Sequence, residues 1–192
     1  AALRRFDPRP IVRPSLMRLV GQFEDSAVLS LPSGIESLCI DVEEGTYPIR
    51  ANYLRVGSRR PLGVGAGSLA LLAWLPDAER EAAIEILLGQ LQRYPRITAE
   101  LLHERIAEAR TKGYCVLLDV VVERMGGIGV PILDPQGRPV AAISIAALND
   151  RILSREAAMG QSLKHEAMQC QVRWAEATRP AQRVAHRVNA SK

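Results

Sequence analysis

The sequence predicts an α+β domain in which helices pack around one twisted, largely antiparallel sheet. Three observations lead to this class. The predicted elements run helix, strands, helices, strands, helix; a tight turn at Asp134–Gly137 joins two apolar strands; and strands outnumber strand–helix–strand units. Because strands joined by a short turn pair antiparallel, the sheet should be mostly antiparallel.

The composition is that of one ordinary globular domain. The chain has 192 residues, of which 47% are hydrophobic, 24% charged and only 4% aromatic. The core must therefore be aliphatic, and a chain of this length can bury one. No apolar run approaches the roughly 18 residues that a membrane span needs, and there is no signal peptide. We therefore expect a cytoplasmic protein without a membrane partner.

Charge, cysteine and histidine usage exclude several functions. The net charge of +4 is dilute, and the basic pairs at 4–5 and 59–60 lack interleaved aromatic residues, so a nucleic-acid surface is not predicted. The three cysteines lie far apart without CxxC spacing, which argues against a disulfide framework. The three histidines show no ligand spacing with one another. We expect neither a metal nor a cofactor.

The first half of the chain predicts two helices and two or three strands. A helix over 11–23 is indicated by residues at four-residue steps, three of them apolar: Ile11, Ser15, Leu19 and Phe23. Strands at 27–31 and 38–42 follow, joined by Pro32-Ser33-Gly34, and a further strand is expected near 49–54. A short helix at 68–74 comes after a glycine-rich loop.

The second half predicts three helices and three strands. Asp77 caps a helix over 77–91, and Thr98 caps one over 98–112 that ends at Gly113. The apolar run 114–122 predicts a strand buried on both faces. Strands 128–133 and 139–148 form a hairpin, with 140–147 inside the sheet. Ser154 is expected to cap a final helix over 154–174, before a basic, polar tail.

The stretch 57–73 is the most informative part of the chain. Gly63, Gly65 and Gly67 alternate just before an apolar run. Glycine suits backbone with positive φ or a close approach, and a loop that opens a helix leaves N–H groups pointing outward. This predicts a pocket for a small molecule that is anionic or bears a carbonyl group. The alternative is a tight turn feeding a buried helix. The loop is not a Walker A element, because Ser68 and Leu69 follow it.

Three segments of the chain resemble the effector-binding domain of IclR-family bacterial transcription regulators. Residues 57–76 are similar to the family's G-x-R-x-P-L…G-x-A-L-L-A-x-L-P stretch. Residues 109–116 match its R-x-x-G-Y-x-V junction, and residues 129–144 match A-x-P-I-x-D-x-x-G-x-x-V-A-A-L-S. The resemblance covers about residues 10–175 and implies a GAF-like fold, which is of the α+β class expected above.

The resemblance also implies a domain organisation. Members of the family carry an N-terminal winged helix-turn-helix that binds operator DNA, a linker helix, and a domain that binds a small metabolite. No helix-turn-helix is evident here, so we expect a linker remnant at 1–9, the effector-binding domain at 10–178 and a flexible tail at 179–192. Operator DNA would be a partner only through an N-terminal domain outside these residues. The resemblance further implies self-association as dimers or tetramers.

The effector pocket implied by the resemblance draws on the glycine loop and three strands. Its lining would be Ala66, Gly67, Leu117, Met125, Gly127, Ser144 and Ala146, with Asn52 as a further donor. Alternation along the last strand independently places residues 142, 144 and 146 on one face, a wall of small residues with one hydroxyl. The alternative for Ser144 is a hydroxyl bonded to the backbone.

Three departures from the family bear on the ligand. Members that bind small carboxylates usually have an acidic residue at the position of Leu117, Cys at Gly127 and Ser at Ala146. Burying a small anion without these groups is costly, and Gly and Ala should enlarge the cavity. We therefore expect an effector larger and less polar than a two- or three-carbon keto acid, although an organic acid stays open.

An enzyme and a ligand-free oligomerisation module are the alternatives to a sensor. No Ser, Cys or His lies in a recognisable catalytic motif, and Cys115 falls in a buried apolar run where thiols are inert. Glu43 and Glu44 are adjacent on a strand and so point to opposite faces. We do not expect an enzyme.

Overall fold

The structure, a computed structural model, describes residues 6–51 and 54–179. The elements in the first part of the chain are α1 (Arg9–Phe23), β1 (Ser26–Ser33), β2 (Glu36–Glu43), β3 (Arg59–Pro61), α2 (Ala66–Ala73) and α3 (Asp77–Leu88). They continue with a short 3₁₀ turn, η1 (Leu91–Arg93), then α4 (Ala99–Lys112), β4 (Cys115–Leu118), β5 (Met125–Leu133), β6 (Pro139–Leu148), α5 (Asn149–Leu153) and α6 (Glu156–Thr178).

Six strands of the described chain form one curled sheet in the order β3-β2-β1-β6-β5-β4. Every pairing between these strands is antiparallel. The β5–β6 hairpin lies where the sequence placed it, and β6 contains the whole of 140–147. The α+β class with an antiparallel sheet is therefore confirmed.

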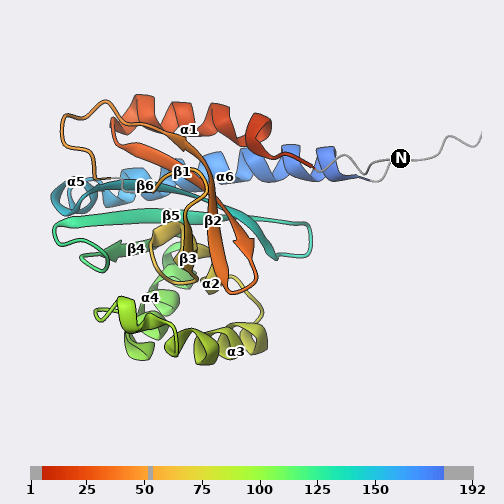
Figure 1. Cartoon of the computed structure of the whole chain (residues 1–192). Coiled ribbons are helices and arrows are strands. Elements are labelled where there is room, and N and C mark those ends of the chain that lie inside the picture. The colour runs from red at the N-terminus through yellow and green to blue at the C-terminus, as the bar shows by residue number, and fades with distance from the viewer. Residues whose placement is uncertain (1–5, 52–53, 180–192) are drawn as a thin grey trace, which may run out of the picture.

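Helices cover both faces of the sheet (Figure 1). α1 and α6 lie side by side on one face, and α2, α3 and α4 lie on the other. Each face has its own aliphatic core: Leu16, Ile143 and Leu163 belong to the first, and Leu69, Leu87 and Leu102 to the second. The aliphatic core expected from the scarcity of aromatic residues is confirmed.

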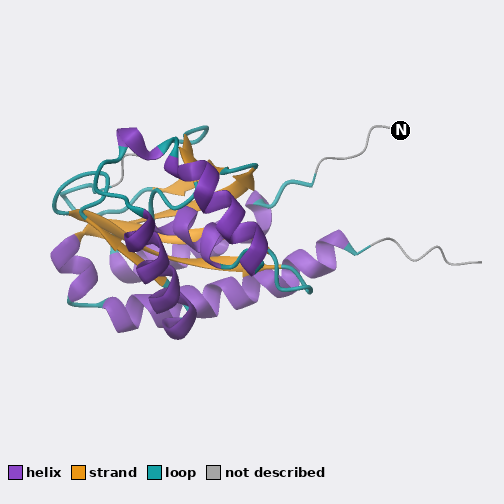
Figure 2. Cartoon of the chain, turned by 90° about the horizontal axis from the view of Figure 1, so that it is seen from below, coloured by secondary structure: helices purple, strands orange, loops and turns teal. Residues whose placement is uncertain are grey.

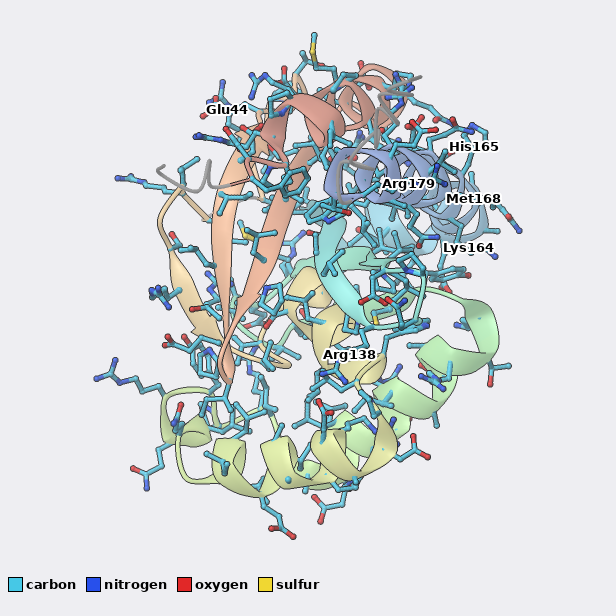
Figure 3. All side chains as sticks on the ribbon, turned by 90° about the vertical axis from the view of Figure 1, so that its right-hand side faces the viewer. Glu44, Arg138, Lys164, His165, Met168 and Arg179 are labelled. Atoms are coloured by element: carbon cyan, nitrogen blue, oxygen red, sulfur yellow. The ribbon has the colours of Figure 1, made fainter. Side chains whose placement is uncertain are left out.

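Two side-chain contacts join segments that are far apart in the sequence. Figure 2 shows the start of α1 and the end of α6 on the same side of the molecule, where the rings of Phe6 and Trp174 lie 5.1 Å apart. Figure 3 shows Arg138, at the turn between β5 and β6, beside the layer of α3. Its guanidinium donates to the Glu79 carboxylate of α3 at 2.7 and 2.9 Å.

Two of the predicted strands differ from the structure. Residues 49–51 and 54 form no strand, and residues 52–53 lie outside the described part; the edge of β2 pairs instead with β3 at Arg59–Pro61. The apolar run 114–122 forms a strand only over Cys115–Leu118, which is buried at alternate residues. β4 pairs only with β5 in the described sheet, and Asp119, with φ of 61°, turns the chain out of it. The apolar residues after Asp119 therefore belong to a loop.

The helix boundaries were predicted well except for two caps. Thr98 caps α4 by accepting from the Leu101 N–H at 3.1 Å, and Gly113 ends it with φ of 83°. Asp77, however, is the first residue of α3 and follows a Pro76 cap. Ser154 ends the short helix α5, which was not predicted, and α6 begins at Glu156. The tail was predicted over 179–192; Arg179 is the C-cap of α6, and residues 180–192 lie outside the described part of the chain.

Within the described residues, no helix is long and apolar enough to cross a membrane. No group of three or more metal-ligating side chains is close enough to hold a metal ion in the same part of the chain.

Candidate functional site

The glycine loop brings the start of α2 down onto the sheet. Gly63 and Gly65 have φ of 87° and 99°, a conformation that residues with a Cβ rarely adopt. The helix consequently begins at Ala66, two residues earlier than expected. Its first N–H groups, at 66–68, have no partner within the helix. They form the positive pole of α2 against the sheet.

Glycines of β5 allow this close approach. A Cβ on Gly129 would lie 3.0 Å from the backbone of Ala66 and from the N–H nitrogen of Gly67, and one on Gly127 would lie 3.0 Å from the Ala66 Cβ. Glycine in a strand interior commonly marks such an approach. The extra room expected at Gly127 is therefore absent, because the first turn of α2 occupies it.

A cavity of about 50 Å³ lies between this turn of α2 and the concave side of the sheet. Seven of the eight predicted site residues line it: Ala66, Gly67, Leu117, Met125, Gly127, Ser144 and Ala146. Asn52, the eighth, lies outside the described residues. The cavity is about a third of the ~150 Å³ that takes a benzene molecule in an engineered protein. In this conformation it suits a ligand of a few heavy atoms.

Ser144 lies directly beneath the start of α2. A Cβ on Gly67 would be 3.1 Å from the Ser144 Oγ, so the two residues are in contact across the cavity wall. The side chain is almost completely buried, and its hydroxyl has no hydrogen-bonding partner among the described residues. The alternative, a hydrogen bond from this hydroxyl to the backbone, is therefore not found in the structure. It is instead available to a molecule in the cavity.

The opposite wall of the cavity is formed by β1, β2 and β3, and none of its residues was among those predicted. Ser30, Ser37, Cys39 and Arg60 line it. β2 buries Ser37, Cys39 and Asp41 while leaving Leu38 and Ile40 half exposed, the reverse of an ordinary half-buried strand. That reversed alternation, polar residues inward, is the sequence pattern that could have located this wall.

The cysteines do not provide a reactive thiol. Burial, and to a smaller extent the nearby Asp41 carboxylate, raises the pKa of Cys39 to about 11, so its thiol is neutral at neutral pH. Burial raises the pKa of Cys115 further still. A nucleophilic thiol needs a lowered pKa and access. Cys115 is inert, as expected.

The loop after β4 closes one end of the cavity. Val120 and Val121 line it, and Asp119 holds the loop by accepting from the Arg124 N–H at 2.6 Å and from the Asn149 Nδ2 at 2.7 Å. The Arg96 guanidinium donates to the Asp119 carbonyl at 2.6 Å. One residue thus connects the cavity wall to the start of α5.

Comparisons with known proteins identify the family of this chain. Residues 1–172 match the family described as bacterial transcriptional regulator IclR C-terminal. The chain belongs to this family. The resemblance seen in the three sequence segments is thereby confirmed.

Curated relatives of this IclR C-terminal domain are regulators. It is 33% identical over 131 residues to a probable transcriptional regulator, SauR, of Cupriavidus necator, covering 68% of this chain and 52% of that protein. It is 30% identical over 148 residues to the HTH-type transcriptional regulator KipR of Bacillus subtilis, covering 77% and 59%. The chain thus spans about half the length of the curated relatives it matches.

Solved structures show the same fold. The IclR protein of Thermotoga maritima aligns with a TM-score of 0.81 at 26% identity, over 90% of this chain and 70% of that one. The C-terminal domain of the Escherichia coli regulator KdgR aligns with a TM-score of 0.74 at 20% identity, over 88% and 99%. The relatives and the fold are those of transcriptional regulators and not of enzymes.

Proposed function

We propose that this domain senses a small metabolite and that the cavity beneath the start of α2 is the effector site of a DNA-binding regulator. The observation that carries the proposal is Ser144. A buried hydroxyl without a protein partner is costly unless a ligand or water satisfies it. Here it faces the positive end of a helix, which favours an anionic or carbonyl oxygen.

The size of the cavity favours a small effector over the bulkier one expected from the sequence. The space foreseen at Gly127 is taken by Ala66, and about 50 Å³ remains. An aromatic or branched effector would require the loop that contains Val120 and Val121 to move outward. The ligand proposed here is accordingly a small organic molecule with at least one hydrogen-bonding group.

A thermal-shift screen with a metabolite library tests this function. Ligands that bind the folded state raise its unfolding temperature by mass action. Gly67→Leu should abolish the shift, because the added side chain fills the cavity at Ser144. Gly21→Leu is the matched control, since a Cβ at Gly21 has no neighbour within 4 Å. A shift that survives Gly67→Leu would place the effector elsewhere, and turnover of the stabilising metabolite would favour an enzyme.

Self-association is the second part of the proposal. Exposed apolar side chains, including Phe6 and Val56, border an open groove on the outer side of β1 and β2. Exposed apolar patches of this kind mark interaction surfaces, and regulators of palindromic operators are usually two-fold symmetric. Light scattering should give a mass above the 21.0 kDa of one chain. A monomer at high micromolar concentration would contradict it; self-association without any metabolite binding would favour an oligomerisation module.

Operator binding is assigned to a separate DNA-binding domain in the whole regulator, which would act in the cytoplasm. The charge of this chain is dilute, so its own affinity for DNA should be weak and should disappear with added salt. A mobility-shift assay with the chain at 50 and 200 mM salt tests this. Salt-resistant, sequence-selective binding would contradict it.

A further inference from the structure

The cavity has a second polar end, at β3. Ser37 and Arg60 are directly opposite each other in the pairing of β2 with β3. Their Cβ atoms therefore lie on the same face, about 5 Å apart. The Arg60 side chain runs back toward the glycine loop: a Cβ on Gly65 would lie 3.8 Å from its Nη1. Both residues line the cavity, on the wall opposite Gly127.

We infer that Arg60, with Ser30 and Ser37, forms an anion subsite that makes the effector a carboxylate, bound by its acid group at the β3 end of the cavity. The inference rests on the proposed function and adds to it the chemical class of the ligand and the residue that selects it. Arg60 is not among the eight site residues that the family resemblance implied.

The charge of the lining supports an anion. Among the described residues that line the cavity, Arg60 is the only one ionised at neutral pH; there is no Asp, Glu or Lys, and Cys39 is a neutral thiol. The Arg60 guanidinium and the positive end of α2 both lie at the glycine loop, since the guanidinium is next to Gly65 and the helix begins at Ala66. A carboxylate is the group that such a site stabilises, because guanidinium binds it in a planar, two-pronged geometry.

The serines supply the remaining donors. Ser30 and Ser37 are 5% and 6% exposed, and neither hydroxyl has a hydrogen-bonding partner among the described residues. Ser37 pairs with Pro32 of β1 whereas Ser144 pairs with Val28, so the two serines are two strands and four residues apart, about 17 Å in a regular sheet. The Arg60 guanidinium comes nearer to Ser144, because it lies beside Gly65, two residues before the Gly67 that contacts Ser144. The two ends can therefore hold different groups of one ligand. Leu117 and Ala146 stand where family members that bind small carboxylates usually have polar residues, and the serines of β1 and β2 supply donors in their place.

The test compares acids with their neutral amides. Acetate, pyruvate, butanoate and benzoate, each beside its primary amide, are titrated by calorimetry into the wild-type chain and into four variants. Arg60→Ala should weaken the binding of the best acid at least tenfold and leave the affinity for its amide unchanged. Arg60→Lys keeps the charge but not the two-pronged geometry, so its affinity for the acid should lie between those of the wild type and of Arg60→Ala. Arg59→Ala removes the same charge one residue away, where the side chain pairs with Glu36 and Ser33, and should change nothing. Ser144→Ala should weaken acids and amides alike.

The outcomes separate this inference from the proposed function. Amides that bind as tightly as acids, or an Arg60→Ala variant that keeps wild-type affinity for acids, would overturn the anion subsite while leaving the effector cavity in place. Acids that lose affinity in Arg60→Ala but not in Ser144→Ala would support the subsite and contradict the role proposed for Ser144. Absence of binding by every acid of the series would overturn the inference.

Discussion

Gly67 and Ser144 meet at the centre of the candidate site: a Cβ on Gly67 would lie 3.1 Å from the Ser144 Oγ and 3.4 Å from its Cβ. Gly67 has ordinary helical backbone, so its glycine is explained by this approach and not by its own conformation. The contact joins α2 to β6, two elements about 75 residues apart in the sequence. A substitution at either residue should therefore change the cavity directly.

Gly67→Ala should therefore separate binding from stability. Alanine is better than glycine in a helix by about 0.5–1 kcal/mol, which offsets the tight contact with Ser144, so the unfolding temperature should change little. The methyl group takes space in a cavity of about 50 Å³ and should reduce the thermal shift caused by an effector.

Ser144→Ala should cost about 0.5–1.5 kcal/mol of binding free energy, because one neutral hydrogen bond to the effector is lost. Unchanged affinity in both variants would contradict the site.

Asp119→Ala should loosen the loop that closes the cavity. The substitution removes the acceptor of the Arg124 N–H and of the Asn149 amide, so we expect faster amide hydrogen exchange over 119–124 and faster effector release. Asp134→Ala is the matched control, because Asp134 accepts similar bonds, from the Gln136 and Arg138 N–H groups, in a turn outside the cavity lining. Equal effects of both variants on effector release would show that the loop does not gate the cavity.

Gly160→Ala should destabilise the protein while Gly21→Ala stabilises it. Both glycines lie inside helices, α6 and α1. A Cβ on Gly160 would overlap the ring of Tyr114, whose hydroxyl donates to Glu156 at 3.1 Å, whereas one on Gly21 has no neighbour within 4 Å. We expect a loss of about 1–3 kcal/mol for the first, from overpacking, and a gain of about 0.5–1 kcal/mol for the second. Urea unfolding measures both, and changes of the same sign would contradict the packing of Tyr114 on α6.

Glu166→Gln should weaken the contact between α6 and α1 in a pH-dependent way. Burial by itself raises the pKa of Glu166, but bonds from Arg18, at 2.7 and 2.9 Å, and from Ser15 outweigh it and hold the pKa below its usual 4.5. A lowered folded-state pKa stabilises the protein above the unfolded pKa, and this contribution is lost as the pH falls through the folded value.

The variant should thus lose about 1 kcal/mol at pH 7, and the difference from wild type should shrink below about pH 4.5. Glu176→Gln, on the exposed side of the same helix, should match the wild type throughout. Unfolding free energies measured from pH 3 to 7 test the sign. A difference that grows toward acid would contradict the assignment.

The sequence by itself determined much of this protein. Periodicity, the Thr98 cap, the Gly113 stop and the Asp134–Gly137 turn act over a few residues, so they predicted four long helices and the last hairpin within a few residues. Alternation along β6 correctly separated Ser144 from Ile143 and Ile145, because neighbouring side chains in a strand must point to opposite faces. The three matching segments identified the family.

The tertiary structure decided the rest, since it depends on contacts between distant segments. Whether the space at Gly127 stays empty depends on the first turn of α2, which packs there from 60 residues earlier in the chain. Whether 114–122 is a buried strand depends on which neighbours the sheet provides, and β4 has only β5 beside it among the described strands. Arg60 became part of the cavity for the same reason: the pairing of β3 with β2 sets it opposite Ser37, and no local pattern encodes which strand will lie beside which.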